Sequence, residues 1–134
     1  MTYLLDTNVW VVFLRNPRSP VVPRLRATQP ADVRICSVVV AELYYGCLRS
    51  ANPAANRGKV EALLRPFRSL PFDDVAAGHY ADVRRHLESV GTPIGPYDLQ
   101  VAAIALTHGC TLVTHNTKEF SRVPGLLLDD WEMP

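Results

Sequence analysis

The chain has 134 residues, of which 48% are hydrophobic and 20% are charged, and its formal net charge is +1 at pH 7. A chain of this length can bury its own core and fits a single domain over residues 1–134. The small net charge excludes nucleic-acid binding by bulk positive charge. No apolar stretch is long enough to span a bilayer, so we expect no membrane association.

In the first half of the chain, short apolar runs typical of buried strands alternate with segments of helical periodicity. Prolines mark the ends of several helical segments, because the residue before a proline is disfavoured in a helix. The predicted elements are a strand over Tyr3–Leu5, a helix over Thr7–Leu14, a loop containing Pro17, Pro20 and Pro23, a strand over Val33–Cys36, a helix over Val40–Leu48 with Ser37 as its N-cap, and a helix that begins at Asn52-Pro53.

The clearest amphipathic pattern follows Asp73 and Asp74, either of which can cap a helix. Apolar residues there recur at intervals of four and three, on one helical face: Ala76, Tyr80, Val83, Leu87 and Val90. The other predicted elements are a strand over Leu70–Phe72, a helix from Pro96 to Gly109, a strand over Thr111–Thr114, a short helix over Thr117–Phe120 and a strand over Leu126–Leu128.

Strands and helices alternate along the whole chain, which is typical of a parallel sheet with helices on both faces. We therefore predict an α/β fold of three layers around a central, mostly parallel sheet of four to five strands. The N-terminus lacks the basic region of a signal peptide. The three cysteines, Cys36, Cys47 and Cys110, form neither a disulfide framework nor a zinc pattern, so we expect buried, reduced thiols in a cytoplasmic protein.

Acids and amides stand where the predicted strands end or the following helices begin. In such a fold the active groups lie at the carboxyl ends of the strands, so these side chains can converge on one edge. They are Asp6 with Thr7 and Asn8, then Glu42 about one turn into its helix, Asp98 in the first turn of its helix, and Asn116, Thr117 and Glu119 after the fourth strand.

Four carboxylates in one cleft repel one another unless a cation joins them. Magnesium fits, because it takes one or two carboxylates, keeps several waters and acts on phosphate groups. One ion can activate a water, and two ions about 3.5–4 Å apart can clamp the attacking and leaving oxygens. No cysteine or histidine cluster offers a softer metal site. His115 could serve as a base, although metal-activated water makes a histidine unnecessary.

Each of these residues also has a purely structural interpretation. Asp6 could cap the helix at Thr7, and Asp98 could stabilise the start of its own helix. Asn116 and Thr117 could form a turn, and Glu119 could be a solvated acid. Glu42 is harder to explain in this way, because it lies on a largely apolar helix and needs a partner there. The catalytic interpretation rests on the whole set.

Four segments of the chain resemble the PIN-domain family, and more narrowly its VapC-type toxins. They are DTN at residues 6–8, AEL around Glu42, PIGPYDLQVAAIA around Asp98, and the final VTHNTKEFSRVPGLLLDDW. The resemblance covers the whole chain in order and spacing, and the two C-terminal segments are long and specific. It implies a PIN-like fold and a magnesium- or manganese-dependent endoribonuclease that is the toxin of a toxin–antitoxin system.

By position, the resemblance makes Asp6 and Asp98 the main metal ligands, and Glu42 and Glu119 the other catalytic acids. Asn116 would orient the last segment or bind a metal-bound water, with Thr7, Asn8 and Thr117 in supporting places. The family often has Asp where this chain has Glu119, which leaves open whether Glu119 contacts the metal directly. VapC-type toxins typically cut structured RNA, often tRNA in the anticodon loop. The stretch from Pro93 to Trp131 resembles toxins associated with initiator tRNA.

The resemblance also implies a cognate antitoxin that wraps an apolar surface and pushes a basic side chain toward the acids. Tyr44, Tyr45 and Trp10 are candidate anchors for it or core residues. A homodimer is expected by analogy. Two alternative functions remain: a phospho-acceptor switch of the receiver kind, which Lys118 alone favours, and a metal-dependent phosphatase or deoxyribonuclease that uses the same acids. Incubation with RNA, single-stranded DNA and a phosphomonoester discriminates among them.

Overall fold

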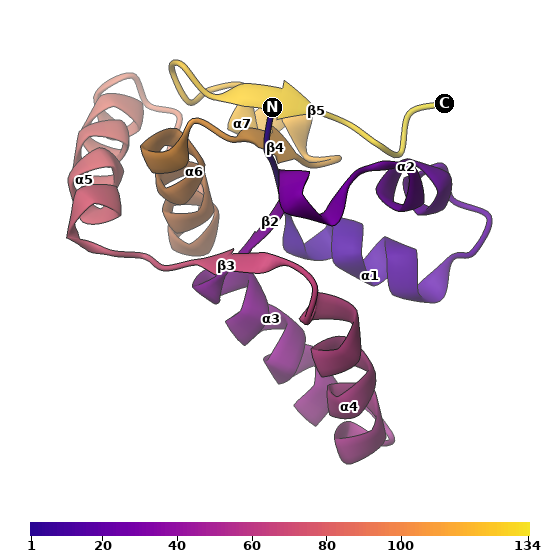
Figure 1. Ribbon diagram of the computed structural model, residues 1–134. Helices are drawn as coiled ribbons and strands as arrows, with labels where there is room; N and C mark the ends of the chain where they lie inside the picture. The colour runs from indigo at the N-terminus through magenta and orange to yellow at the C-terminus, as the bar shows by residue number, and fades with distance from the viewer.

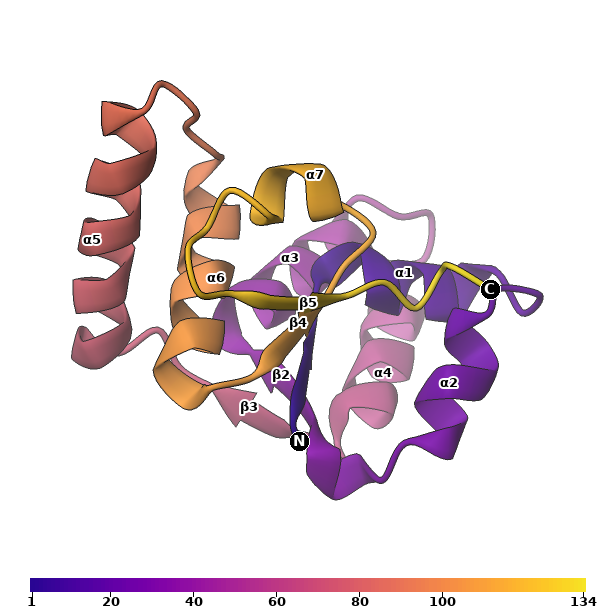
Figure 2. The same cartoon turned by 90° about the horizontal axis from the view of Figure 1, so that it is seen from above.

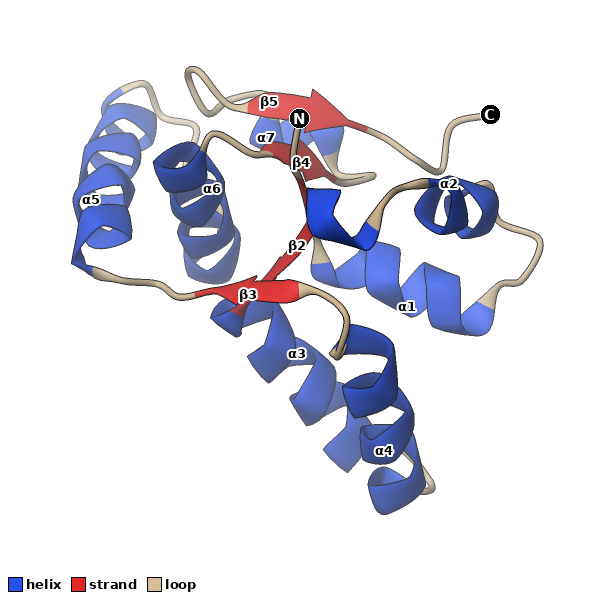
Figure 3. Cartoon of the chain, in the orientation of Figure 1, coloured by secondary structure: helices blue, strands red, loops and turns tan.

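The computed structural model describes residues 1–134 and contains one five-stranded sheet (Figures 1 and 3). All neighbouring strands are parallel, and their order is β3-β2-β1-β4-β5. The strands are β1 (Tyr3–Leu5), β2 (Val33–Cys36), β3 (Arg68–Leu70), β4 (Thr111–Val113) and β5 (Leu127–Asp129). The predicted parallel sheet is therefore confirmed.

Helices cover both faces of this sheet. Figures 1 and 2 show α5 and α6 together on one side and α1, α2 and α4 on the other, while α3 contacts both α1 and α6. The three-layer prediction is confirmed. The helices are α1 (Thr7–Arg15), α2 (Val21–Ala27), the 3-10 turn η1 (Pro30–Asp32), α3 (Ser37–Leu48), α4 (Pro53–Leu64), α5 (Asp74–Ser89), α6 (Pro96–His108) and α7 (Thr117–Phe120).

Strand β1 lies at the centre of the sheet, where the direction of winding reverses. The chain moves outward from β1 through β2 to β3, and then crosses back to place β4 on the other side of β1. Ligand sites of open parallel sheets lie outside the carboxyl ends of the strands at such a reversal. Here that point lies between β1 and β4, where the Asp6 backbone N–H donates to the Val113 carbonyl at 2.9 Å.

The capping residues predicted from the sequence lie at the ends of α5 and α6 in the structure. The side chain of Asp73 caps α5 by accepting a hydrogen bond from the Ala76 N–H at 2.9 Å. Gly109 follows α6 with a φ of 62°, a left-handed conformation that glycine adopts without strain. The predicted core face of α5 is wrong at its last position, because the side chain of Val90 is 56% exposed beyond the end of the helix.

Three local predictions are wrong. The predicted loop is present at Pro17 and Pro20, but Pro23 lies in the first turn of a helix, α2, where its missing N–H would have no intrahelical partner anyway. Ser37 is the first helical residue of α3 and not its N-cap, which is Cys36. The edge strands are displaced from their predicted ranges, since β3 ends at Leu70 and β5 ends at Asp129.

A cluster of 30 buried residues forms one core between the sheet and the helices. Trp10 is fully buried in it and stacks at a tilt on Phe67, with 5.3 Å between ring centroids. The suggestion that Trp10 anchors a partner is therefore wrong. All three cysteines are buried and free, as predicted. None of the helices combines the length and the apolar character needed to cross a membrane.

Candidate active site

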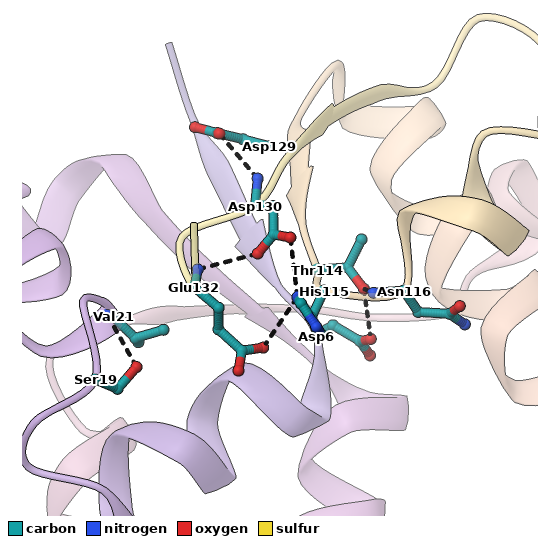
Figure 4. A network of polar contacts seen from close by, with 9 residues as sticks. All are labelled: Asp6, Ser19, Val21, Thr114, His115, Asn116, Asp129, Asp130 and Glu132. Carbon is teal, nitrogen blue, oxygen red and sulfur yellow. Dashed lines mark hydrogen bonds and ion pairs between the residues drawn. The ribbon is translucent and has the colours of Figure 1, made fainter. Parts of the chain in front are cut away.

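Asp6 stands at the carboxyl end of β1 and at the start of α1, and its side chain is almost completely buried. Its Oδ1 accepts a hydrogen bond from the Thr7 N–H at 2.8 Å, so Asp6 does cap the helix. Its Oδ2 accepts a second bond from the Thr114 hydroxyl at 3.1 Å (Figure 4). Capping and a place in the cleft are thus compatible, because the two carboxylate oxygens have separate partners.

The loop after β4 supports this carboxylate. Thr114 is completely buried, and its hydroxyl oxygen accepts a hydrogen bond from the Asn116 N–H at 3.0 Å while its hydrogen points to Asp6. The Asn116 side-chain amide in turn donates to Glu119 Oε2 at 3.2 Å. A chain of contacts therefore runs from Asp6 through Thr114 and Asn116 to Glu119.

A cleft of about 140 Å³ opens beside Asp6. Five of the predicted site residues besides Asp6 line it together with apolar groups from α3 and α6. The lining residues are Asp6, Thr7, Asn8, Val38, Glu42, Tyr97, Asp98, Val101 and Asn116. The structure therefore brings side chains from the ends of β1 and β4 together with acids from α3 and α6.

Two predicted residues on α7 do not line this cleft, namely Glu119 and Thr117. Glu119 still belongs to the acidic cluster, because its charge acts on Asp98 and its carboxylate is held by Asn116. Thr117 is the first residue of α7, and its side chain makes no hydrogen bond.

The electrostatics of the cleft are those of an uncompensated acidic cluster. Burial, together with the negative charges of Asp6, Glu119 and Glu42, raises the pKa of Asp98 to about 6. Burial also raises the pKa of Asp6, against the lowering effect of its two hydrogen bonds. No lysine or arginine lines the cleft. A divalent cation would supply the missing charge, and the oxygen donors of these side chains fit a hard ion such as magnesium or manganese.

The raised pKa of Asp98 predicts how stability depends on pH in excess chelator. The folded protein holds this proton up to about pH 6, whereas the ordinary value is 3.8, so the free energy of unfolding falls as pH rises between these values. Thermal melting at pH 4, 5, 6 and 7 should show this fall in the parent relative to Asp98→Asn, which mimics the protonated side chain. Parallel profiles for the two proteins would contradict the raised pKa of Asp98, which burial and the neighbouring acids cause.

Sequence reasoning overlooked Thr114, although it directly follows β4 and the rule of strand ends would have selected it. It also missed a second group of potential metal ligands. His115 Nδ1 lies 2.9 Å from Asp130 Oδ2 and 3.8 Å from Glu132 Oε2. The sequence prediction considered no site of this kind, in which a single histidine joins two acids. The three residues of this group come from two segments that lie far apart in the sequence, so no short sequence motif indicates the group.

Comparison with known proteins identifies the class that this fold and cleft define. The model of the PIN domain family matches residues 3–126. The tRNA(fMet)-specific endonuclease VapC of Shigella flexneri is 35% identical over 131 residues, 98% of each chain. Ribonuclease VapC2 of Rickettsia felis is 35% identical over 133 residues, covering 98% of this chain and 99% of the relative. The chain therefore belongs to the PIN-domain family.

The similarity extends to a solved complex. The crystal structure of DNA-bound VapBC from Salmonella typhimurium contains a chain that is 34% identical, with a TM-score of 0.91 and 98% coverage of both chains. The predicted resemblance to VapC-type proteins is confirmed along the whole chain. The names of the relatives agree with the prediction of a nuclease that acts on RNA, and membership of the PIN family leaves no support for a receiver-like switch.

Proposed function

We propose that this protein is a magnesium-dependent endoribonuclease and the toxic component of a toxin–antitoxin system. One observation carries the proposal: the negative charges of Asp6, Glu42 and Glu119 all act on Asp98, in a cleft without a basic side chain. Acids with strongly perturbed pKa values in a cleft are candidates for a functional site. The full-length similarity to VapC ribonucleases supports the same activity.

In this proposal Asp6 and Asp98 hold the ion, because both line the cleft and burial raises the pKa of each carboxyl, so that a cation would stabilise their charged forms. The bound cation supplies charge neutralisation at the phosphodiester and activation of water. Thr114 fixes one oxygen of Asp6, which leaves the direction of that carboxylate little freedom. Asn116 keeps Glu119 beside the cleft, and Glu42 completes the acidic set from α3.

We further propose that the substrate is structured RNA and that the cut falls in an exposed loop of tRNA. The Shigella flexneri relative is named for its specificity for tRNA(fMet), which supports initiator tRNA as the first candidate. Loop nucleotides are suited to recognition by a protein, because their unstacked bases can be splayed against a protein surface. The anticodon loop is the loop we expect to be cut.

Metal dependence and substrate class can be tested in one assay. Purified protein should cleave tRNA with magnesium or manganese, lose this activity in excess chelator, and regain it when magnesium is restored. Matched reactions with single-stranded DNA and a phosphomonoester should show little turnover, and the Asp98→Asn protein serves as a control for contaminating nuclease. Full cleavage in chelator would falsify the metal mechanism, and faster turnover of DNA or phosphomonoester would favour the alternative enzyme classes.

We propose that the partner is a cognate antitoxin that lies across helices α1, α3 and α4. A groove of about 220 Å³ between these helices is lined by apolar side chains such as Val11, Leu43 and Val60. Glu42 lines both this groove and the acidic cleft, so a segment in the groove can reach the acids. An arginine could pair there with a carboxylate and compete with the metal. Several structurally similar chains come from VapBC complexes, which supports this proposal.

A further inference from the structure

Three potential metal ligands meet beside the acidic cleft, where the C-terminal segment passes the loop after β4 (Figure 4). Two of them, His115 and Glu132, line a pocket that Asp6 and Asn116 also line. His115 Nδ1 lies 2.9 Å from Asp130 Oδ2 and 3.8 Å from Glu132 Oε2. All three donor atoms lie within 4.8 Å of one another. The fold itself creates this cluster, because His115 follows β4 whereas both acids follow β5.

The buried side chain of Trp131 holds the segment that carries Asp130 and Glu132 in place. Trp131 lies between them in the sequence, is only 2% exposed, and packs on Tyr3 with 5.3 Å between ring centroids. Its indole N–H donates to Asp129 Oδ2 at 3.1 Å. The Glu132 N–H donates to Asp130 Oδ1 at 3.0 Å, which leaves the other oxygen of Asp130 directed at His115. The cluster is therefore preorganised by packing and by backbone contacts.

The charges of this cluster are not matched within the protein. A single ring nitrogen carries at most one proton, so His115 Nδ1 cannot serve both carboxylates at once. Asp130 takes that contact, while Glu132 Oε2 at 3.8 Å lies beyond hydrogen-bond distance. No N–H or O–H group donates to the Glu132 carboxylate, whose side chain is 24% exposed. The neighbouring Arg24 is already paired with Asp129.

We propose that His115, Asp130 and Glu132 bind a transition-metal ion of the zinc class. Zinc takes imidazole nitrogen and carboxylate oxygen at about 2.0–2.2 Å, and tetrahedral geometry then separates neighbouring donors by about 3.3 Å. The observed separations of 2.9 and 3.8 Å lie on either side of that value. Three protein ligands leave a fourth position for water.

This site differs in metal preference from the acidic cleft. The cleft offers only oxygen donors, which suit magnesium, whereas an imidazole nitrogen favours zinc, nickel or copper. Zinc requires a neutral imidazole, and Asp130 raises the pKa of His115, so binding should weaken as the pH falls. A bound ion would join the C-terminal segment to the loop that carries Thr114 and Asn116.

Imidazole nitrogen NMR tests the site residue by residue, because the chain has only four histidines. Zinc is titrated into the parent protein in the presence of excess magnesium. We expect the ring nitrogen signals of His115 to move while those of His79, His86 and His108 stay in place. Magnesium alone should move the His115 signals much less than zinc does. Zinc that leaves His115 unmoved, or magnesium that moves it as far as zinc does, would overturn the proposal.

Zinc affinity provides a second measurement. Calorimetric titration is carried out in an Asp98→Asn background, so that the acidic cleft contributes little. Adding His115→Ala or Glu132→Gln should weaken binding by more than the about 10–100-fold that loss of an outer partner of a metal ligand costs. His108→Ala is the matched control, because His108 is also exposed and is outside the cluster. Equal zinc affinity with and without His115 would show that the ion binds elsewhere.

Discussion

Replacement of Asp98 by Asn is expected to reduce RNA cleavage by more than about 10–100-fold, since it removes a proposed metal ligand and not merely an outer partner. In chelator the same variant should be at least as stable as the parent, because it removes one member of a repulsive group of acids. Magnesium should raise the melting temperature of the parent more than that of the variant. Melting curves with and without magnesium, beside a tRNA cleavage assay, measure both effects.

The alternative role of Asp98, stabilisation of a helix N-terminus, has a matched control in the same chain. Asp74 also lies in the first turn of a helix, is exposed, and is outside the acidic cluster. If the helix dipole were the only role of Asp98, both Asp→Asn changes would cost about 0.3–1 kcal/mol and leave cleavage intact. We expect Asp74→Asn to behave in that way and Asp98→Asn to differ. Equal cleavage by the two variants would reject the catalytic role of Asp98.

The parts of this fold that the sequence predicts are those specified by local chemistry. The periodicity of α5, its Asp73 cap and the glycine after α6 each act within a few residues, so a linear pattern contains them. Asp6 and Asp98 could also be predicted, because strand ends and helix starts can be located from such patterns. The convergence of their carboxylates followed from the general rule for parallel sheets.

The parts that escaped prediction depend on contacts between distant residues. Thr114 and Asp6 are separated by 108 positions, and their hydrogen bond exists only because β4 pairs with β1. His115 meets Asp130 only after the chain has passed through α7 and β5. The helix at Val21–Ala27 was missed for a different reason. The proline content suggested a loop, whereas Pro23 lies in the first helical turn, where a backbone N–H has no intrahelical partner to lose.

Thr114 is therefore a candidate positioning residue, and its removal gives the second large effect that we expect. Thr114→Val keeps the shape of the side chain but deprives Asp6 Oδ2 and the Asn116 N–H of their shared partner. Loss of an outer partner of a metal ligand typically costs about 10–100-fold in affinity or activity, and we expect cleavage to fall within that range. Because the site is fully buried, stability should also fall by about 1–3 kcal/mol.

A positioning role makes a prediction that a loss of stability alone does not make. The Thr114→Val protein, assayed well below its melting temperature, should need more magnesium for half-maximal cleavage, and excess magnesium should partly restore its rate. Thr114→Ser restores the hydroxyl and should cleave nearly as well as the parent. Thr107→Val is the control, because that hydroxyl bonds only the Ala103 carbonyl within α6, at 2.8 Å. If Thr114→Val melts lower but keeps the parental magnesium dependence and rate, Thr114 supports the fold and does not position Asp6 for catalysis.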